Sequence, residues 1–364
     1  MFKLTILADI SSPHTIRWVN SLASFDINIL LIGLGDKHYS VDMPNVKVIS
    51  YKNKNVTGSY VNKLFFKLKY LIYVLKIIKE IKRFNPDILH SYYASSYGLI
   101  GALTRIKPYV ISVWGSDVTD FPNKSSLHRN LIKYNLKAAT SICATSFSLK
   151  DETSKYSSKD INVIPFGIDI DRFSPRNKKF SKQITIGTVK YFDKIYGIET
   201  LIKAFSILIK DKKLDFDLKL LLVGDGKEKQ NYIDIIKSEG ISDRVEFTGF
   251  VKNELLVEKY HNMDIVVIPS FRESFGLSVI EAMSCEIPVI ASDISGFNEV
   301  GTDETITYFT AGNVEMLAKN IIDIINNYDL ALVKAKKARE RVIDNFSSDY
   351  CVNMQMSLYK QLKR

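Results

Sequence analysis

The chain has 364 residues and three cysteines, is 46% hydrophobic and 25% charged, and carries a net charge of +10. This length suits two domains of ordinary size, and the composition is that of a globular protein with a buried core in each. Cysteines this few and this far apart argue against a disulfide framework or a zinc site. The N-terminus lacks a signal-peptide pattern, and no apolar run approaches the roughly 18–20 residues of a transmembrane helix, so we expect a cytoplasmic protein.

The predicted elements alternate between strands and helices along the whole chain. In the first half, strands are predicted over 3–9, 28–33, 46–51, 87–94, 108–114 and 141–146, and helices over 15–23, 60–83 and 98–104. The alternation restarts after a polar, lysine-rich linker, with strands over 184–190, 218–223, 245–251, 263–268 and 288–291. Strands that alternate with helices form parallel sheets, so the sequence predicts an α/β protein with two doubly wound sheets.

The excess positive charge lies in the first half of the chain. Residues 1–170 contain 22 Lys and Arg against 12 Asp and Glu, whereas the remainder contains 28 of each. Such asymmetry indicates an anionic partner, which is nucleic acid, an acidic membrane surface or an anionic acceptor.

The helix predicted over 60–83 has an apolar side and a basic side. The apolar side is predicted from Leu64, Leu68, Leu71, Leu75 and Ile78, and the basic side from Lys69, Lys76, Lys79 and Arg83. This pattern is typical of a packing helix with a solvated lysine face. It is equally typical of a basic amphipathic surface that rests on anionic lipid.

A glycine-containing turn, Gly224-Asp225-Gly226, follows the strand predicted over 218–223. It lacks the third glycine of the dinucleotide-binding fingerprint, and an acidic residue follows its first glycine. A nicotinamide-dependent enzyme is therefore disfavoured.

The most informative stretch covers residues 263–284. Its apolar beginning predicts a buried strand, a short polar loop follows, and 274–284 has the spacing of a helix. Gly276 at the start of this helix lets a ligand approach the free backbone N–H groups, which attract phosphates. Glu273 lies in the loop and Glu281 in the helix, and two carboxylates beside an anion site are costly unless hydroxyls bind them. Hydroxyls that flank a phosphate indicate a sugar nucleotide.

This stretch also resembles a known family. Residues 273–283 read Glu-Ser-Phe-Gly-Leu-Ser-Val-Ile-Glu-Ala-Met, and Ile-Pro-Val-Ile-Ala follows over 287–291. Together they resemble the Glu-x7-Glu signature of the retaining glycosyltransferases of family 4, which have the GT-B fold. The resemblance implies two Rossmann-like domains with an interdomain cleft. The expected domains are 1–172 for the acceptor, 173–346 for the nucleotide sugar, and a helix over 347–364 that crosses back to the first domain.

For the second domain, the resemblance implies a set of donor-binding residues. Glu281 would bind ribose hydroxyls, and Glu273 would bind hexose hydroxyls near the reacting centre. Lys190 and Lys194 would neutralise the departing diphosphate, Lys194 lying slightly earlier than the usual lysine of the family. The remaining donor-binding residues are Gly187, Val251 at the nucleobase, Ser274, Phe275, Gly276 and Leu277.

For the first domain, the resemblance implies an acceptor site at the strand ends, formed by Ser12, His14, Trp114 and Asp117. Trp114 stands where many members of the family carry a histidine. Asp117 is then the nearest ionisable group and a catalytic candidate that would orient an acceptor hydroxyl. Capping of the following helix is the alternative role of Asp117.

Asp169-Ile170-Asp171 has the form of the Asp-x-Asp metal motif of other glycosyltransferases. It lies within Pro-Phe-Gly-Ile-Asp-Ile-Asp-Arg-Phe, residues 165–173, which resembles the interdomain junction of family 4. Because GT-B members generally hold the diphosphate with basic side chains and helix dipoles, we expect no metal and no cofactor besides the nucleotide-sugar co-substrate.

These assignments predict a hexosyltransferase-type enzyme that moves a sugar from a nucleotide diphosphate sugar, with UDP favoured, to an acceptor hydroxyl with retention. The basic, aromatic first half favours a cell-envelope glycan or glycolipid acceptor, and peripheral contact with the inner face of the membrane. The alternatives are a non-catalytic nucleotide-sugar-binding subunit and a GT-B epimerase or hydrolase. Nucleic acid is not expected as a partner, because it would leave Glu273 and Glu281 without a role.

Overall fold

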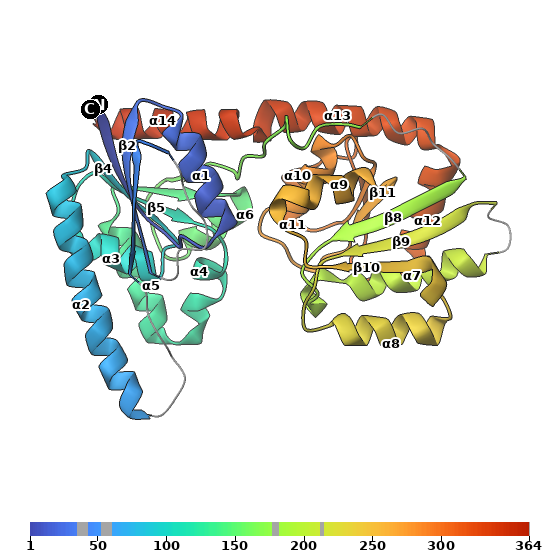
Figure 1. Ribbon diagram of the computed structural model, residues 1–364, viewed down its shortest axis with the longest axis horizontal. Helices are drawn as coiled ribbons and strands as arrows, with labels where there is room; N and C mark the ends of the chain where they lie inside the picture. The colour runs from blue at the N-terminus through green and yellow to red at the C-terminus, as the bar shows by residue number, and fades with distance from the viewer. Residues whose placement is uncertain (35–42, 52–59, 177–181, 212–214, 364) are drawn as a thin grey trace. The chain divides into compact units, whose positions relative to one another are not determined.

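The computed structural model describes residues 1–34, 43–51, 60–176, 182–211 and 215–363, with the backbone alone for 60–71. The chain forms two compact units, an N-terminal unit of residues 1–166 with 351–364 and a C-terminal unit of residues 167–350. Each unit contains one parallel sheet with helices, which confirms the predicted pair of doubly wound α/β domains (Figure 1). No helix in the described part of the chain is long and apolar enough to cross a bilayer.

The boundaries between the units lie a few residues away from the expected ones. The N–H of Ile168 donates to the carbonyl of Phe346 at 2.8 Å, and the N–H of Ser348 donates to the carbonyl of Ile168 at 2.8 Å. These bonds attach the segment that follows residue 166 to the C-terminal unit. The chain re-enters the N-terminal unit at Cys351.

The N-terminal unit contains a seven-stranded sheet in the order β3-β2-β1-β4-β5-β6-β7. Its strands are β1 (Phe2–Leu7), β2 (Ile27–Leu34), β3 (Val46–Tyr51), β4 (Ile88–Tyr92), β5 (Tyr109–Val113), β6 (Ser141–Ala144) and β7 (Ile161–Val163). Its helices are α1 (Pro13–Ala23), α2 (Tyr60–Phe84), α3 (Ser96–Thr104), α4 (Ser116–Thr119), η1 (Phe121–Lys124), α5 (Ser126–Ala138), α6 (Phe147–Ser154) and α14 (Ser348–Lys363).

Helices cover both faces of this sheet. On one face, α1 and α14 enclose a core that includes Trp18 and Tyr359. On the other face, α2, α3, α5 and α6 enclose a core that includes Val74, Ile100 and Leu136. The N-terminal unit is therefore a three-layer structure in which the last helix of the chain supplies part of one layer.

A buried polar network joins α14 to the middle of this sheet. The His90 Nδ1 atom lies 2.5 Å from the hydroxyl of Tyr359, and its Nε2 atom lies 2.8 Å from the hydroxyl of Ser112. Burial lowers the pKa of His90 from 6.5 to about 3. The imidazole is therefore neutral at physiological pH, so one ring nitrogen donates a hydrogen bond and the other accepts one.

Helix α2 buries a different side from the predicted one. Val74, Ile77 and Ile81 are buried, whereas Leu75, which the sequence placed on the apolar side, is 61% exposed. Leu64, Leu68 and Leu71 lie outside the residues whose side chains are described. Ile78, the β-branched member of the predicted side, is half-buried against the core, whereas Val74, Ile77 and Ile81, which supply the inward stripe at helical spacing, were not predicted.

The C-terminal unit contains a six-stranded sheet in the order β10-β9-β8-β11-β12-β13. Its strands are β8 (Gln183–Val189), β9 (Asp217–Val223), β10 (Val245–Gly249), β11 (Ile265–Ile268), β12 (Val289–Ser292) and β13 (Thr307–Phe309). Its helices are η2 (Lys194–Tyr196), α7 (Ile198–Lys210), α8 (Lys229–Glu239), η3 (Ser242–Arg244), η4 (Asn253–Leu255), α9 (Leu256–His261), α10 (Leu277–Ser284), α11 (Ser295–Asn298), α12 (Val314–Asn326) and α13 (Tyr328–Phe346).

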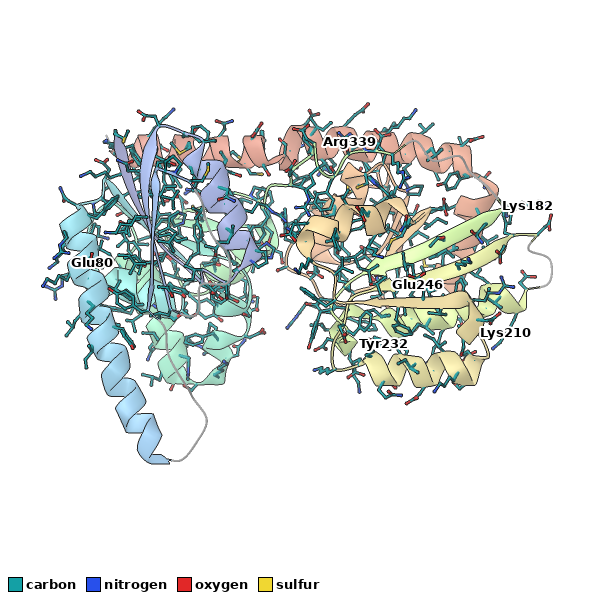
Figure 2. The ribbon with its side chains drawn as sticks, viewed as in Figure 1. Glu80, Lys182, Lys210, Tyr232, Glu246 and Arg339 are labelled. Carbon is teal, nitrogen blue, oxygen red and sulfur yellow. The ribbon has the colours of Figure 1, made fainter. Side chains whose placement is uncertain are left out.

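The faces of this second sheet are covered in the same way. Helices α7, α8 and α12 enclose a core that includes Phe205, Tyr232 and Ile321. Helix α10 packs against β11, β12 and α13. Arg339 on α13, labelled in Figure 2, donates to the carbonyl of Phe173 at 3.1 Å and to that of Ile170 at 3.3 Å. This guanidinium fixes the start of the unit to one of its last helices.

Each sheet has one point at which the strand order reverses. In the N-terminal unit β1 lies beside β4, and in the C-terminal unit β8 lies beside β11. Because the connections after two such strands leave on opposite faces, a crevice forms outside their carboxyl ends. Open α/β sheets bind their ligands at such topological switch points.

Candidate functional site

The predicted donor residues lie at the switch point of the C-terminal unit. Lys190 directly follows β8, and the loop that contains Glu273 follows β11. Residues Ile265 and Val266 of β11 pair with Ile186 and Gly187 of β8, so the two strand ends are neighbours. The topology thus brings together two residues that are far apart in the sequence.

Lys190 and Glu273 form an ion pair. The distance from Lys190 Nζ to Glu273 Oε2 is 2.7 Å, and the two side chains are only 8% and 18% exposed. The same ammonium group lies 5.1 Å from the ring centroid of Tyr196, within the range of a cation–π interaction. Burial, followed by the negative charges of Glu273 and Asp193, raises the pKa of Tyr196. The sequence assigned separate roles to Lys190 and Glu273, and the structure places them in contact.

Gly197 allows the start of α7 to approach this point. It has a left-handed backbone with φ of +61°, and a Cβ atom there would collide with the main-chain oxygen of Pro269. The N–H of Phe271 donates to the carbonyl of Ile195 at 2.8 Å, which joins the loop after β11 to η2. A side chain at position 197 would therefore separate two of the segments that form the site.

Helix α10 begins at Leu277, three positions later than the helical spacing from Ser274 suggested. Gly276 ends the loop with a φ of +91°, and an added Cβ would lie 2.8 Å from Phe297 Cδ1. The first N–H groups of an α-helix have no intrahelical acceptor, so this turn offers donors to an anion. The ring of Phe275 is buried, with its centroid 5.9 Å from that of Phe346. Only the backbone of Phe275 is therefore suited to contact the nucleotide sugar.

Glu281 is 5% exposed and accepts a hydrogen bond from the Tyr260 hydroxyl at 2.8 Å. Tyr260 is itself completely buried at the end of α9. Burial, together with the negative charge of Glu281, raises the pKa of Tyr260 well above its ordinary value. The hydroxyl therefore stays protonated and offsets part of the cost of burying a carboxylate.

The other predicted donor residues differ in how well they fit. Lys194 is exposed in η2, near the pair but without an ion-pair partner in the described part of the chain. Val251 is half-buried after β10. Gly187 lies inside β8, where a Cβ would collide with the Met263 side chain. A side chain at this position would therefore enter the core, and the donor role of Gly187 stays a prediction.

At the switch point of the N-terminal unit the side chains are aromatic. We call His14, Tyr92, Trp114 and Phe166 the aromatic cluster. His14 stacks on Phe166 with ring centroids 5.0 Å apart, and Trp114 stacks on Tyr92 at 4.8 Å. The ring centroids of His14 and Trp114 are 6.3 Å apart. The structure therefore brings together two of the four predicted acceptor residues.

His14 is neutral in this cluster. Burial, followed by the positive charge of Arg17, lowers the pKa of His14 from 6.5 to about 4. Its Nδ1 atom is buried and has no hydrogen-bond partner among the described residues. Ser12, at the N-terminal cap of α1, is half-buried two positions before it.

Asp117 does not present its carboxylate for an acceptor. The side chain is fully buried and accepts the N–H groups of Ala94 at 2.7 Å, Gly115 at 2.9 Å and Trp114 at 3.2 Å. Burial raises its pKa, and these backbone N–H groups offset part of that rise. Asp117 therefore fixes the loops after β4 and β5 from the first turn of α4, a structural role other than the predicted helix cap, since α4 has no side-chain cap hydrogen bond.

The Asp-x-Asp segment is also structural. Asp169 Oδ1 accepts the N–H groups of Arg172 at 2.9 Å and Asp171 at 3.2 Å, as in a side-chain-stabilised turn. Within the described ranges, no three His, Cys, Asp or Glu side chains come together in a way that could hold a metal ion.

Sequence reasoning missed several residues of these sites. Tyr196 and Tyr260 contact Lys190 and Glu281, but an isolated tyrosine has no motif that assigns it to a carboxylate or an ammonium group. Phe166 was quoted only as part of the junction. Ser278 lies one turn before Glu281, and its hydroxyl is buried without a partner among the described residues. Its helical spacing from Glu281 was the one available signal.

Two parallel α/β units, one with a charged switch point beside a helix N-terminus, define an enzyme of the GT-B fold. Comparison with known protein families supports this fold. The family described as "Glycosyl transferases group 1" matches residues 169–343, and the family described as "Glycosyl transferase 4-like" matches residues 3–146.

Individual relatives and a solved structure are similar over much of the chain. The N-acetyl-alpha-D-glucosaminyl L-malate synthase of Bacillus anthracis is 30% identical over 307 residues, covering 79% of this chain and 78% of that protein. The capsular polysaccharide biosynthesis glycosyltransferase CapM of Staphylococcus aureus is 29% identical over 255 residues, covering 62% of this chain and 63% of that protein. Anabaena HepE in complex with UDP and glucose has a TM-score of 0.78 at 19% identity, covering 99% of this chain and 100% of that chain. The chain belongs to the group 1 glycosyltransferases and is a glycosyltransferase enzyme.

Proposed function

We propose that this enzyme transfers a hexosyl group from a UDP-sugar to a hydroxyl of a cell-envelope glycan or glycolipid intermediate, with retention at the anomeric carbon. The observation that carries the proposal is the Lys190–Glu273 ion pair at the switch point, beside the start of α10. A cation and helix N–H groups suit a diphosphate, and a carboxylate beside them suits sugar hydroxyls.

Different groups of the site bind different parts of the nucleotide sugar. Lys190 and the first N–H groups of α10 hold the diphosphate and stabilise the charge that develops on it as the anomeric C–O bond breaks. Lys194, exposed in η2, adds a second cation. Glu273 accepts hydrogen bonds from the hexose, and Glu281 accepts them from the ribose. The loop at Val251 contacts the nucleobase through its backbone.

Transfer then needs no protein nucleophile. The acceptor oxygen bonds to the anomeric carbon on the face that the diphosphate leaves, and the acceptor proton passes to a diphosphate oxygen. Neutral His14, with Ser12 and Trp114, contacts the acceptor at the N-terminal unit. In this arrangement the aromatic cluster positions the acceptor and does not exchange its proton.

The choice of UDP and of the acceptor class rests on the similar proteins. HepE was solved in complex with UDP and glucose, and CapM is named for capsular polysaccharide biosynthesis.

A first experiment is thermal unfolding of the full chain with UDP, GDP, ADP and CMP and their sugars, without metal. A ligand that binds only the folded state stabilises it by RT ln(1 + [L]/Kd), so the true donor family raises Tm at millimolar concentration. NMR of the product then gives the anomeric configuration. The absence of any shift would contradict the proposed donor site, and an inverted product would contradict retention.

We further propose that α2 rests on an anionic membrane surface. Its exposed side joins two apolar residues, Ile72 and Leu75, to Lys76, Lys79 and Lys82 at helical spacing. Each basic residue near an anionic bilayer contributes about 1 kcal/mol. Sedimentation with phosphatidylglycerol vesicles, but not with phosphatidylcholine vesicles, is expected for the wild type and is lost in K76E/K79E. Equal sedimentation of the variant would contradict the assignment.

A further inference from the structure

The buried pair formed by Tyr260 and Glu281 goes beyond the roles given to the donor-binding residues. The Tyr260 hydroxyl donates to Glu281 Oε2 at 2.8 Å and lies 3.4 Å from the main-chain oxygen of Ser278. It therefore contacts both the carboxylate and the first turn of the helix that carries it. We infer that Tyr260 is a positioning residue that fixes the Glu281 carboxylate for the ribose hydroxyls of the donor.

The surroundings of Tyr260 hold its ring in one place. The side chain is fully buried, and its ring lies edge-on to that of Phe173 with centroids 6.0 Å apart. Phe173 is in turn fixed through its carbonyl, which accepts hydrogen bonds from Arg339 at 3.1 Å and from the hydroxyl of Ser284 at 2.6 Å. A hydroxyl mounted on so constrained a ring has little freedom to follow a moving partner.

Glu281 needs such a partner because of where it lies. It is 5% exposed in α10, a helix of only eight residues whose side chains from Ser278 to Ser284 are all buried. A buried carboxylate without a donor costs far more than one that is hydrogen-bonded. The Tyr260 hydrogen bond satisfies Oε2 and selects one orientation of the carboxylate plane. That orientation determines the direction in which the other carboxylate oxygen, Oε1, points.

This assignment makes Tyr260 different from a packing tyrosine. The loss of a packing residue would disturb the site as a whole and weaken every ligand by the same factor. A positioning residue for Glu281 affects only the part of the ligand that Glu281 binds. The inference rests on the proposed nucleotide-sugar donor site, and it names the ribose as the moiety through which Tyr260 acts.

The test compares UDP with 2′,3′-dideoxy-UDP as calorimetric probes of the full chain. The wild type is expected to bind UDP at least tenfold more tightly than the dideoxy compound. Tyr260→Phe keeps the ring and removes the hydroxyl, and we expect it to weaken UDP about tenfold while leaving 2′,3′-dideoxy-UDP unchanged. Tyr328→Phe is the matched control, because its hydroxyl donates to the main-chain oxygen of Asp264 at 3.2 Å in the same unit, and both affinities should stay at wild-type values.

If Y260F unfolds because the buried Glu281 carboxylate loses a hydrogen-bond donor, a second pair of variants tests the same coupling without that charge. E281Q and Y260F/E281Q remove the buried charge, so the tyrosine no longer has a carboxylate to position. The two should bind UDP equally if Tyr260 acts through Glu281. A further loss of UDP affinity in the double variant would overturn the inference.

The remaining outcomes separate this inference from the proposed function. Equal weakening of UDP and 2′,3′-dideoxy-UDP by Y260F overturns the positioning role and leaves the donor site standing. If the wild type binds both compounds equally, Glu281 does not bind the ribose hydroxyls, and the inference fails. A wild type that binds no nucleoside diphosphate overturns both.

Discussion

The two units share one topology and differ in the chemistry at their switch points. The C-terminal unit places an ammonium group and a carboxylate 2.7 Å apart, and a second buried carboxylate lies in the adjacent helix. The N-terminal unit places the rings of the aromatic cluster there, including a histidine that its surroundings keep neutral. The same strand order thus carries a charged switch point in one unit and an aromatic one in the other.

The positive charge of the N-terminal half bears on the same contrast. Among the described residues, Arg17 acts on His14 of the aromatic cluster and helps to lower its pKa. Described cations such as Lys76, Lys79 and Lys82 are exposed on α2, at the outer surface of the unit. The net charge of a unit therefore says little about the charge of its site, and the two must be tested separately.

The largest expected effect is on the charged switch point. Lys190→Ala should lower kcat/KM by about 100-fold or more, because a preorganised cation at a leaving group contributes several kcal/mol. The loss of kcat/KM is measured by steady-state kinetics, with the donor that the thermal unfolding experiment identifies. Lys203→Ala is the control, since Lys203 also pairs with a glutamate, Glu199, at 2.7 Å but on an exposed face of α7. A similar loss in both variants would remove the special role of Lys190.

Acid should destabilise the N-terminal unit selectively. The folded pKa of His90 is about 3, below its ordinary 6.5, so protons bind the unfolded state first and stability falls as pH drops between these values. From pH 7 to pH 5 His90 accounts for about 2 kcal/mol of the loss, and His14, whose pKa is lowered to about 4, adds a loss of the same sign. Hydrogen exchange, corrected for intrinsic rates, measures the loss of stability at β4 and β5 and compares it with the loss in the C-terminal sheet. His90→Gln, which cannot titrate, should show a smaller loss, and an equal loss in both sheets would contradict the assignment to His90.

A change in the aromatic cluster should act on the acceptor alone. Trp114→Phe keeps a ring but reduces the stacked area, and we expect the acceptor KM to rise about fivefold, or roughly 1 kcal/mol. The donor KM should stay the same. If the donor KM rises instead, the aromatic cluster is not an acceptor site, and the contrast between the two switch points loses its functional meaning.

The smallest expected effect has the opposite sign. Glu273→Gln frees Lys190 from its partner and removes a negative charge near the diphosphate, so UDP should bind about threefold to fivefold more tightly, roughly 1 kcal/mol. The UDP-sugar should lose affinity relative to UDP, because the hexose loses an acceptor. Glu199→Gln is the matched control, and calorimetry with both ligands is the measurement. Weaker binding of UDP by Glu273→Gln would show that the ion pair itself forms part of the diphosphate site.

The sequence predicted the layers and the charged residues better than it predicted contacts. Alternating strands and helices were enough to predict both sheets, and the motif around Glu273 and Glu281 pointed to a helix N-terminus. The Lys190–Glu273 contact was not predictable, because it depends on the register of β8 and β11, which no local pattern encodes. The roles of Gly187 and Asp117 were ambiguous for a different reason. A glycine and an aspartate suit a ligand site and a tightly packed turn equally well, and only burial separates the two.

The position of α14 has a consequence for the synthesis of the protein. The N-terminal unit includes residues 351–364, and Tyr359 bonds to His90 in the middle of its first sheet. These residues follow the whole C-terminal unit in the chain, so the N-terminal unit cannot complete its core until the C-terminal unit has been synthesised. The C-terminal unit, contained in residues 167–350, has no such dependence. Domains usually fold in order of synthesis, but here the order of completion is reversed, and a nascent chain stalled before residue 351 would expose one face of an unfinished sheet.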